Sequence, residues 1–179
     1  RLNLDVDAPN LAPFGFGLAG SLTAKGYAQG EPKTLSVDLA GSAANFKALD
    51  AVKAERLSYR ILASPDLGKP LAVDVKGSGV SFPGVEVRQI DAQASGTLAS
   101  HAFAGDLDMS LDDKDYRLTL RSRGGFDSAW RWTGDVSSLN LGGAAQIRLL
   151  NAARVSASSD SFSVSPARWG LFGGSLDLG

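Results

Sequence analysis

The chain has 179 residues and a formal net charge of −1; 44% of its residues are hydrophobic and 21% are charged, a balance that excludes a disordered tail and shows no nucleic-acid footprint. Cysteine is absent, which removes thiol nucleophiles, disulfides and thiolate metal sites. Glycine, with 21 residues, lies well above its usual share of about 7%, which favours turns or close backbone approaches over long helices.

Alternation of apolar and polar residues with a period of two dominates the sequence. This period is typical of strands with one buried and one solvated face. Breaks rich in Gly, Pro, Ser and Asp separate the alternating stretches, and short strands at fairly even spacing predict an all-β architecture. In chain order the alternating stretches are 35–39, 57–61, 71–75, 85–87, 107–111, 116–120, 130–132 and 162–164.

One stretch, 45–56, carries a different pattern. Phe46, Leu49 and Val52 have helical spacing there, so the sequence allows one short helix at this point. The alternation resumes at Leu57, and no shift in composition marks a second domain. We therefore expect residues 1–179 to be a single β-rich segment of a longer protein, because strand-like patterns reach both ends of the chain.

The clearest predicted hairpin surrounds the acidic run 112–115. Turn-forming residues separate two alternating stretches there, so we expect a four-residue loop. One register places apolar residues on one side and opposite charges on the other, where such charge pairs stabilise a sheet. The expected pairs are Leu111 with Tyr116, Met109 with Leu118, Leu107 with Leu120, Asp108 with Thr119 and Asp106 with Arg121.

Each predicted strand exposes an apolar row that something must cover, because apolar surface left in water costs about 25 cal/mol per Å². The sheet could pack on itself as a sandwich, close into a barrel, or curl into an open trough filled by an apolar ligand. Period and spacing leave all three open. The residues expected on this apolar face are Leu35, Val37, Leu39, Leu57, Tyr59, Ile61, Leu71, Val73, Val75, Leu107, Met109, Leu111, Tyr116, Leu118, Leu120, Trp130 and Trp132.

Residues that could carry chemistry are few. His101 is the only histidine, and no G-x-S-x-G elbow accompanies it, so a structural or exposed role is expected. The acidic run 106–115 lacks the glycine and closing glutamate of an EF-hand, and Asp106 and Asp108 are expected to pair with basic residues. Tryptophans at alternating strand positions are typical of a core or an interface. We predict no enzyme, no metal and no cofactor.

Two pieces of the sequence resemble a known family. The run 95–101, Ser-Gly-Thr-Leu-Ala-Ser-His, resembles a Gly-Thr-Leu-x-x-His element, and Trp132, Gly134 and Val136 with Leu139 and Leu141 behind them resemble a second one. From about Val85 onward the chain is similar to TamB-like proteins of the translocation and assembly module, within the wider AsmA-like group. The earlier part, 18–75, is similar only in its style of degenerate strands.

This resemblance implies a curled, mostly antiparallel sheet, a taco-shaped groove with a hydrophobic concave face. It implies a periplasmic protein anchored in the inner membrane of a Gram-negative bacterium, with an Omp85-type outer-membrane barrel as its partner. The implied role is phospholipid transport between the membranes, assembly of outer-membrane proteins and autotransporters, or both. Acyl chains or nascent outer-membrane β-strands would be the occupants. The alternative is a structural or adhesive sandwich or solenoid without lipid function.

Overall fold

The computed structural model describes residues 1–31, 34–49 and 51–178, which form a single open sheet of fourteen strands. Every strand pair is antiparallel. The expected all-β fold is confirmed. The elements are β1 (Leu2–Ala8), a 3-10 turn η1 (Ala12–Phe14), β2 (Ala19–Gln29), β3 (Ser36–Ala48), β4 (Val52–Ala63), β5 (Pro70–Phe82), β6 (Val85–Thr97), β7 (Ser100–Leu111), β8 (Lys114–Phe126), β9 (Trp132–Gly143), β10 (Ile147–Leu149), β11 (Ala153–Ala157), β12 (Phe162–Val164), β13 (Ala167–Leu171) and β14 (Gly174–Leu178).

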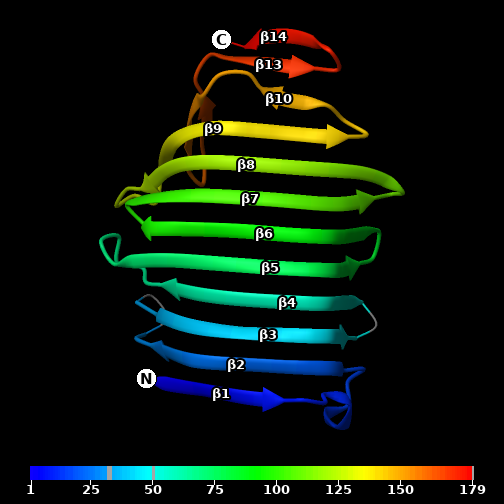
Figure 1. Cartoon of the computed structure of the whole chain (residues 1–179). Helices are drawn as coiled ribbons and strands as arrows, with labels where there is room; N and C mark the ends of the chain where they lie inside the picture. Colours follow the sequence, from blue (N-terminus) through cyan, green and yellow to red (C-terminus); the bar gives the residue numbers. More distant parts are fainter. Residues whose placement is uncertain (32–33, 50, 179) are drawn as a thin grey trace.

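The strands follow one another as a meander. Their spatial order is β1 to β10 and then β13 and β14, so that β1 and β14 lie at opposite ends of the sheet (Figure 1). Because β1 and β14 do not pair, the sheet is not closed, and a barrel is excluded. The strand pairs with extensive contacts are all neighbours in the sheet, so no second layer packs against either face of the described chain, and a sandwich is excluded too.

A sharp corner interrupts the last strands. β10 and β11 both pair with β9, along different parts of its edge, and β11 pairs onward with β12. Figure 1 shows the β11–β12 hairpin turned away from β10 and β13. The pair β10–β13 and the pair β11–β12 are therefore two parts of one long hairpin, separated by a bend. Side chains hold the bend: Asn151 Oδ1 accepts a hydrogen bond from the Arg168 N–H at 2.7 Å, and Ser165 Oγ accepts one from the Arg154 N–H at 2.9 Å.

The strand registers place apolar residues on one face throughout the sheet. Leu39 of β3 pairs with Ile61, Ile61 with Val73, Val73 with Ala94, and Ala94 with Phe103 of β7. Directly paired residues share a face, so these side chains form one continuous row across five strands. We call this side of the sheet the apolar face.

The large side chains of the apolar face are only half-buried. The chain exposes 11159 Å², whereas a compact protein of its mass, 18.6 kDa, exposes about 8,200 Å². Large residues of this face such as Leu57, Ile61 and Leu118 are half-buried although no element covers them. They are shielded by one another, as on the concave side of a curled sheet. The buried apolar residues of the described chain are mostly small, namely Ala8, Leu11, Ala24, Ala43, Ala54, Leu149, Ala153 and Ala167.

A line of irregular positions across the sheet accounts for part of this curl. The pairing of β3 to β6 skips Asn45, Glu55, Gly79 and Arg88, one in each strand. Asn45 and Gly79 have φ values of 48° and 59°. Unpaired and bulged residues bend strands and increase their twist, so their alignment bends neighbouring strands at the same level.

The structure decides one question that the sequence left open and corrects one local prediction. No helix forms over the described part of 45–56, where Phe46 and Val52 lie on the facing strands β3 and β4 and Leu49 lies in the turn between them. The helical spacing arose because three apolar residues surround a tight reversal, and tertiary pairing outweighed it. Asp50 lies outside the described residues.

The predicted register of the β7–β8 hairpin is wrong by two residues. Met109 pairs with Tyr116 and Leu107 with Leu118, and the loop has two residues, Asp112 and Asp113. Both have left-handed backbones, with φ of 48° and 61°, the twist that matches two-residue hairpin loops. A shift of two residues leaves every side chain on its predicted face, so the predicted separation of apolar and charged residues is retained.

Candidate functional site

The registers bring the sequence-predicted apolar residues together on the apolar face. Leu35 and Trp130 are the exceptions, because Leu35 precedes β3 and Trp130 lies in the connection between β8 and β9. The predicted residues found on the strands of this face are Val37, Leu39, Leu57, Tyr59, Ile61, Leu71, Val73, Val75, Leu107, Met109, Leu111, Tyr116, Leu118, Leu120 and Trp132.

Further residues of the face escaped the sequence prediction. Val87 pairs with Met109 while Ile90, three residues later, pairs with Leu107, because a register shift lies between them. A bulge reverses the alternation, so a search for strict period two loses the second half of such a strand. On β9, a register shift likewise places Val136 and Leu139, which are three residues apart, on the same face. Apolar residues spaced by three within an alternating stretch were the signal available.

Charge is nearly absent from this face. Among the described strand pairs of β3 to β9, its positions include no Asp, Glu or Arg, and the one Lys is Lys114, at the end of β7–β8 beside the turn. An uncharged, uncovered surface offers non-directional attraction to apolar groups. Away from Lys114, it offers no partner to an ionic headgroup.

Aromatic rings on the apolar face lie over glycines. A Cβ atom on Gly41 would lie 2.6 Å from the Tyr59 Oη, and Cβ atoms on Gly124 and Gly134 would lie 2.6 and 2.7 Å from ring atoms of Trp132. These contacts are too short for any larger residue, so the glycines allow the rings to lie along the sheet rather than project from it. The glycine excess thus reflects close side-chain approaches as well as turns.

His101 belongs to the same face, at one end of the strands. Its Nδ1 lies 3.2 Å from the carbonyl oxygens of Thr97 and Leu98, and its Nε2 accepts a hydrogen bond of 3.1 Å from the Trp132 Nε1–H. This pattern assigns the proton to Nδ1 of a neutral ring. The ring also stacks on Phe126 at 5.9 Å. Both nitrogens are occupied structurally, as expected from the sequence.

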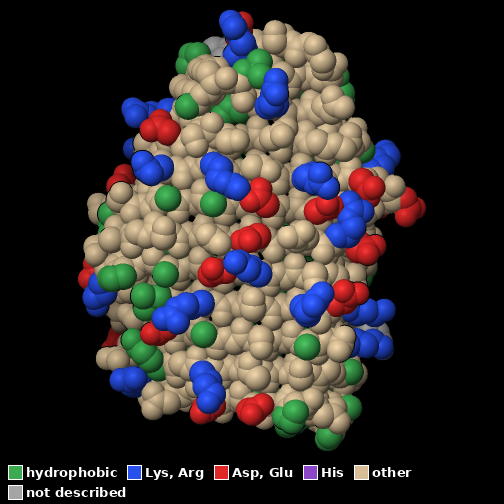
Figure 2. All heavy atoms as spheres, viewed as in Figure 1, with side chains coloured by type: hydrophobic (Ala, Val, Ile, Leu, Met, Phe, Trp, Pro, Cys, Tyr) green, Lys and Arg blue, Asp and Glu red, His purple; other side chains and the backbone are tan. Residues whose placement is uncertain are grey.

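The opposite face carries the charges. Figure 2 shows cations and anions interspersed over it, with few hydrophobic side chains. A shallow depression of about 510 Å³ lies among Ser42, Ser58 and neighbouring residues, and two of the cations that line it have partners. Lys76 forms an ion pair with Asp91 at 3.9 Å, and Arg88 binds two aspartates. The pattern is that of a solvated outer surface.

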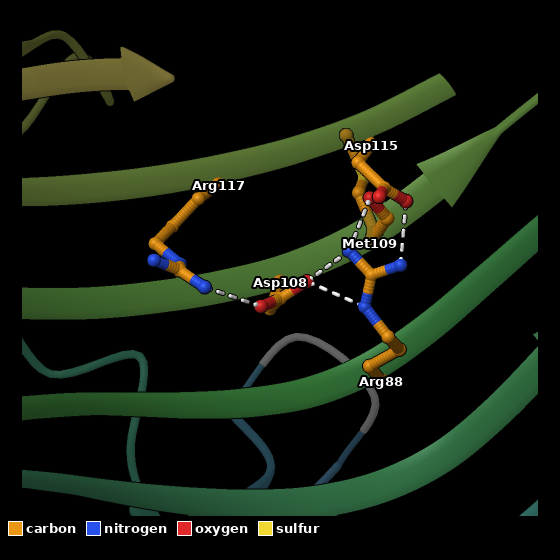
Figure 3. Close-up of polar contacts among 5 residues, drawn as sticks. All are labelled: Arg88, Asp108, Met109, Asp115 and Arg117. Atoms are coloured by element: carbon orange, nitrogen blue, oxygen red, sulfur yellow. Dashed lines mark hydrogen bonds and ion pairs between the residues drawn. The ribbon is translucent and has the colours of Figure 1, made fainter. Parts of the chain in front are cut away.

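An ion-pair network joins β6, β7 and β8 on this polar face (Figure 3). Arg88 donates to Asp108 through Nε at 2.7 Å and also through Nη2, and to Asp115 through Nη1 at 2.6 Å. Arg117 donates to the other oxygen of Asp108 at 3.0 Å. The hydrogen bonds from Arg88, and then those from Arg117, hold the pKa of Asp108 below its ordinary value.

Asp106 has a similar environment. Arg121 donates to it at 2.6 Å and the Thr119 hydroxyl at 2.9 Å, and these two bonds, in that order, lower its pKa. Asp106 and Asp108 therefore act as partners of arginines, as predicted. Within the described residues, no group of three or more His, Asp or Glu side chains is placed to hold a metal ion.

The two rims of the sheet differ in their turns. Turns at alternate ends of a meander share a rim, so the connections following β1, β3, β5, β7, β9 and β13 lie together on one side (Figure 1). Turns on the opposite rim are stabilised by side chains: Thr34, Thr97 and Asp127 each accept a hydrogen bond from a nearby backbone N–H. Leu35 and Trp130, which are 44% and 54% exposed, are large apolar residues of these turns.

The first rim instead exposes large apolar residues, which we call the apolar lip: Phe14, Phe16, Leu49, Phe82, Leu111 and Phe172. Phe16, Leu49 and Phe172 are 82%, 72% and 74% exposed, and their φ values are 55°, 51° and 47°. A left-handed backbone costs a bulky residue on the order of 1 kcal/mol. On the opposite rim, Trp130 also has a positive φ and is 54% exposed, but its ring centroid lies 5.9 Å from that of Phe126, so it has a ring partner.

The described part of the chain contains no helix that is long and apolar enough to cross a bilayer. Comparison with known families shows that residues 1–170 match the family described as TamB, N-terminal domain. No curated protein and no solved structure matches the chain. The match extends over both the part from Val85 onward, where the motifs lie, and the preceding strands. Because it covers nearly the whole of this open, curled sheet, the chain belongs to the TamB family.

Proposed function

We propose that the apolar face of this sheet holds the acyl chains of phospholipids as they pass between the inner and outer membranes. The observation that carries the proposal is a continuous apolar face without a second layer. Apolar surface in water is unfavourable by about 25 cal/mol per Å², so an acyl chain lying along the face would be stabilised by every side chain it covers.

The distribution of charge supports lipid over a soluble ligand. With charges confined to the polar face and the rims, an acyl chain would be held without a specific partner, and its headgroup would remain in water at the open side. Contacts of this kind discriminate poorly among apolar tails. A conduit for mixed phospholipids needs this tolerance.

The family supplies the cellular setting. TamB proteins are components of envelope transport and assembly, not a known enzyme family. In our proposal the 179 residues form one segment of a longer periplasmic protein, anchored in the inner membrane and acting with an Omp85-type barrel in the outer membrane. The face carries no proposed catalytic residue and needs no cofactor.

The second candidate occupant of this sheet is a nascent outer-membrane β-strand. The sheet is open, because β1 and β14 lie at its opposite ends and do not pair with each other. Free strand edges pair readily with extended segments. An incoming amphipathic strand could extend the sheet there while its apolar side continues the apolar face.

The test compares two neighbouring residues on opposite faces. Leu118 pairs with Leu107 and Leu141 on the apolar face, while Thr119 lies on the polar face beside Asp106. We expect Leu118→Arg to abolish function in cells and Thr119→Arg to be mild. Urea unfolding of both variants separates loss of function from loss of fold, because a purely structural face predicts unfolding by Leu118→Arg.

Photocrosslinking avoids the charge change altogether. A photoreactive residue at Leu118 or Val37 in whole cells should capture phospholipid, and the same residue at Thr119 should not. Capture of a barrel protein instead would assign the face to polypeptide clients. If neither lipid nor barrel protein is captured at Leu118 or Val37, the apolar face is a structural surface and the proposal fails.

A further inference from the structure

The apolar lip combines two features that do nothing for the stability of the fold. Phe16, Leu49 and Phe172 project large apolar side chains into solvent, and each does so from a left-handed backbone that Gly or Asn would adopt with less strain. The combination recurs at three separate turns of one rim. Unfavourable local conformations that persist at exposed positions point to a function for the side chain.

The lip is continuous with the apolar face. Phe82 pairs with Val85 and Val85 with Leu111, and all three lie on the apolar face at the end of their strands. Beyond them lie the turns of the lip. An apolar group moving outward across the sheet therefore meets apolar side chains up to the ends of these strands, and then Phe16, Leu49 and Phe172 at three of the turns. The described turns of the opposite rim are held by polar side chains and include no large apolar residue as exposed as these three.

The spacing of the lip identifies its occupant. Turns of one rim follow each other every two strands, about 10 Å apart, and the lip runs along about 50 Å of the sheet. A folded protein partner needs a continuous patch of about 800 Å² on each side. Single protruding Phe and Leu side chains, separated by turns such as Asp112–Asp113, do not form such a patch, but they can each enter the boundary between headgroups and acyl chains.

We propose that the apolar lip inserts into the surface of a phospholipid bilayer and so places the apolar face next to the acyl chains that it receives. This inference rests on the lipid version of the proposed function and adds the side from which lipids enter. The net charge of −1 and the interspersed surface charges provide no electrostatic attraction, so insertion depends on the apolar side chains alone.

The experiment is flotation of the purified chain with phosphatidylcholine vesicles. The variant combines Phe16→Asn, Leu49→Asn and Phe172→Asn, which suit a positive φ. We expect its partition coefficient to fall by about a hundredfold or more, because each inserted Phe or Leu contributes on the order of tenfold. Its urea midpoint should stay the same or rise. The matched control is Phe162→Asn, which removes a 72% exposed Phe near the opposite rim and should bind as wild type.

The absence of cysteine allows a second measurement that does not alter the other tips. A fluorophore on Phe16→Cys, Leu49→Cys or Phe172→Cys should be quenched by brominated acyl chains in the vesicles, and one on Phe162→Cys should not. Three results would each contradict bilayer insertion by the lip: undiminished flotation of the triple variant, no flotation of the wild type, or equal quenching at all four sites.

The outcomes separate this inference from the function on which it rests. The triple variant should still crosslink phospholipid from detergent micelles at Leu118, since its apolar face is intact. If Leu118 captures no lipid while flotation depends on the lip, the bilayer contact stands and the lipid trough fails. If Leu118 captures lipid and the lip variant floats normally, the trough stands and the lip is overturned.

Discussion

Asp108 illustrates how single residues hold neighbouring strands together on the polar face. It accepts hydrogen bonds from Arg88, at the bulge of β6, and from Arg117, its direct partner on β8. The bulge is the point at which the line of irregular positions ends. The network therefore connects the bent part of the sheet with the regular pairing of β7 and β8.

These aspartates predict a loss of stability in acid. Folding lowers the pKa of Asp108 and Asp106, so the unfolded chain binds more protons than the folded chain, and stability rises with pH. Their contribution is present above the unfolded value of 3.8 and is lost as the pH falls below it. Urea midpoints measured from pH 7 to pH 3 should fall less steeply for Asp108→Asn than for wild type.

The control for this titration is Asp7→Asn. Asp7 lies on the polar face of β1, far along the sheet from the Arg88 network. That variant should keep the wild-type dependence on pH. Equal slopes for Asp108→Asn and wild type would show that the network contributes nothing to acid sensitivity.

Glycines have different purposes at different places, which composition alone could not separate. Gly84 lies in a turn with φ of 78° and has open space around it, apart from Asp112 at 3.9 Å. Gly41 lies in mid-strand, where Tyr59 occupies the position of a side chain. The first needs glycine for its backbone, the second for its lack of a Cβ.

At the level of elements, the turns of the first rim provide a paired test of backbone strain. Asp113 has φ of 61° in the two-residue β7–β8 turn, where glycine is preferred. Asp113→Gly should raise the free energy of unfolding by about 0.5–1 kcal/mol, and Gly84→Ala should lower it by about 1 kcal/mol, since Ala resists a positive φ. Urea unfolding monitored by circular dichroism gives both values. A loss of stability in Asp113→Gly would contradict the left-handed turn.

The bends of the sheet are also properties of elements rather than residues. Aligned unpaired positions curve β3 to β6, and a corner at Asn151 and Ser165 turns the β11–β12 hairpin. Where β9, β10 and β13 meet this corner, Leu149, Ala153 and Ala167 form a small buried cluster. Conventional packing is thus found where the bend is sharpest.

For the whole molecule, the large exposed surface of the folded chain determines how it should respond to urea. It exceeds that of a compact protein of equal mass by about a third, so unfolding exposes less new surface. The urea m-value scales with that newly exposed surface. We expect an m-value clearly below that of compact domains of 179 residues. Sedimentation would first show that the protein is a monomer. An m-value typical of compact domains would then mean that the apolar face is sealed in solution.

The sequence by itself determined the class of the fold and its division into two faces. Alternation such as that of Leu71, Val73 and Val75 is a local property, and it persists whatever the strand pairs with. The motifs at 95–101 and 132–141 were also sufficient to suggest the family. Even the hairpin predicted two residues out of register kept its faces, because side chains in a strand repeat every two residues.

Only the tertiary structure decided how the apolar face is left uncovered. A sandwich, a barrel and an open curled sheet share the same alternation, and the choice depends on whether distant strands meet, which local patterns do not encode. The bulge at Arg88, the rings over Gly41 and Gly124, and the gathering of Phe16, Leu49 and Phe172 on one rim likewise arise from pairing between separate strands. Registers and rims are relations between segments, so they exist only once the whole sheet has formed.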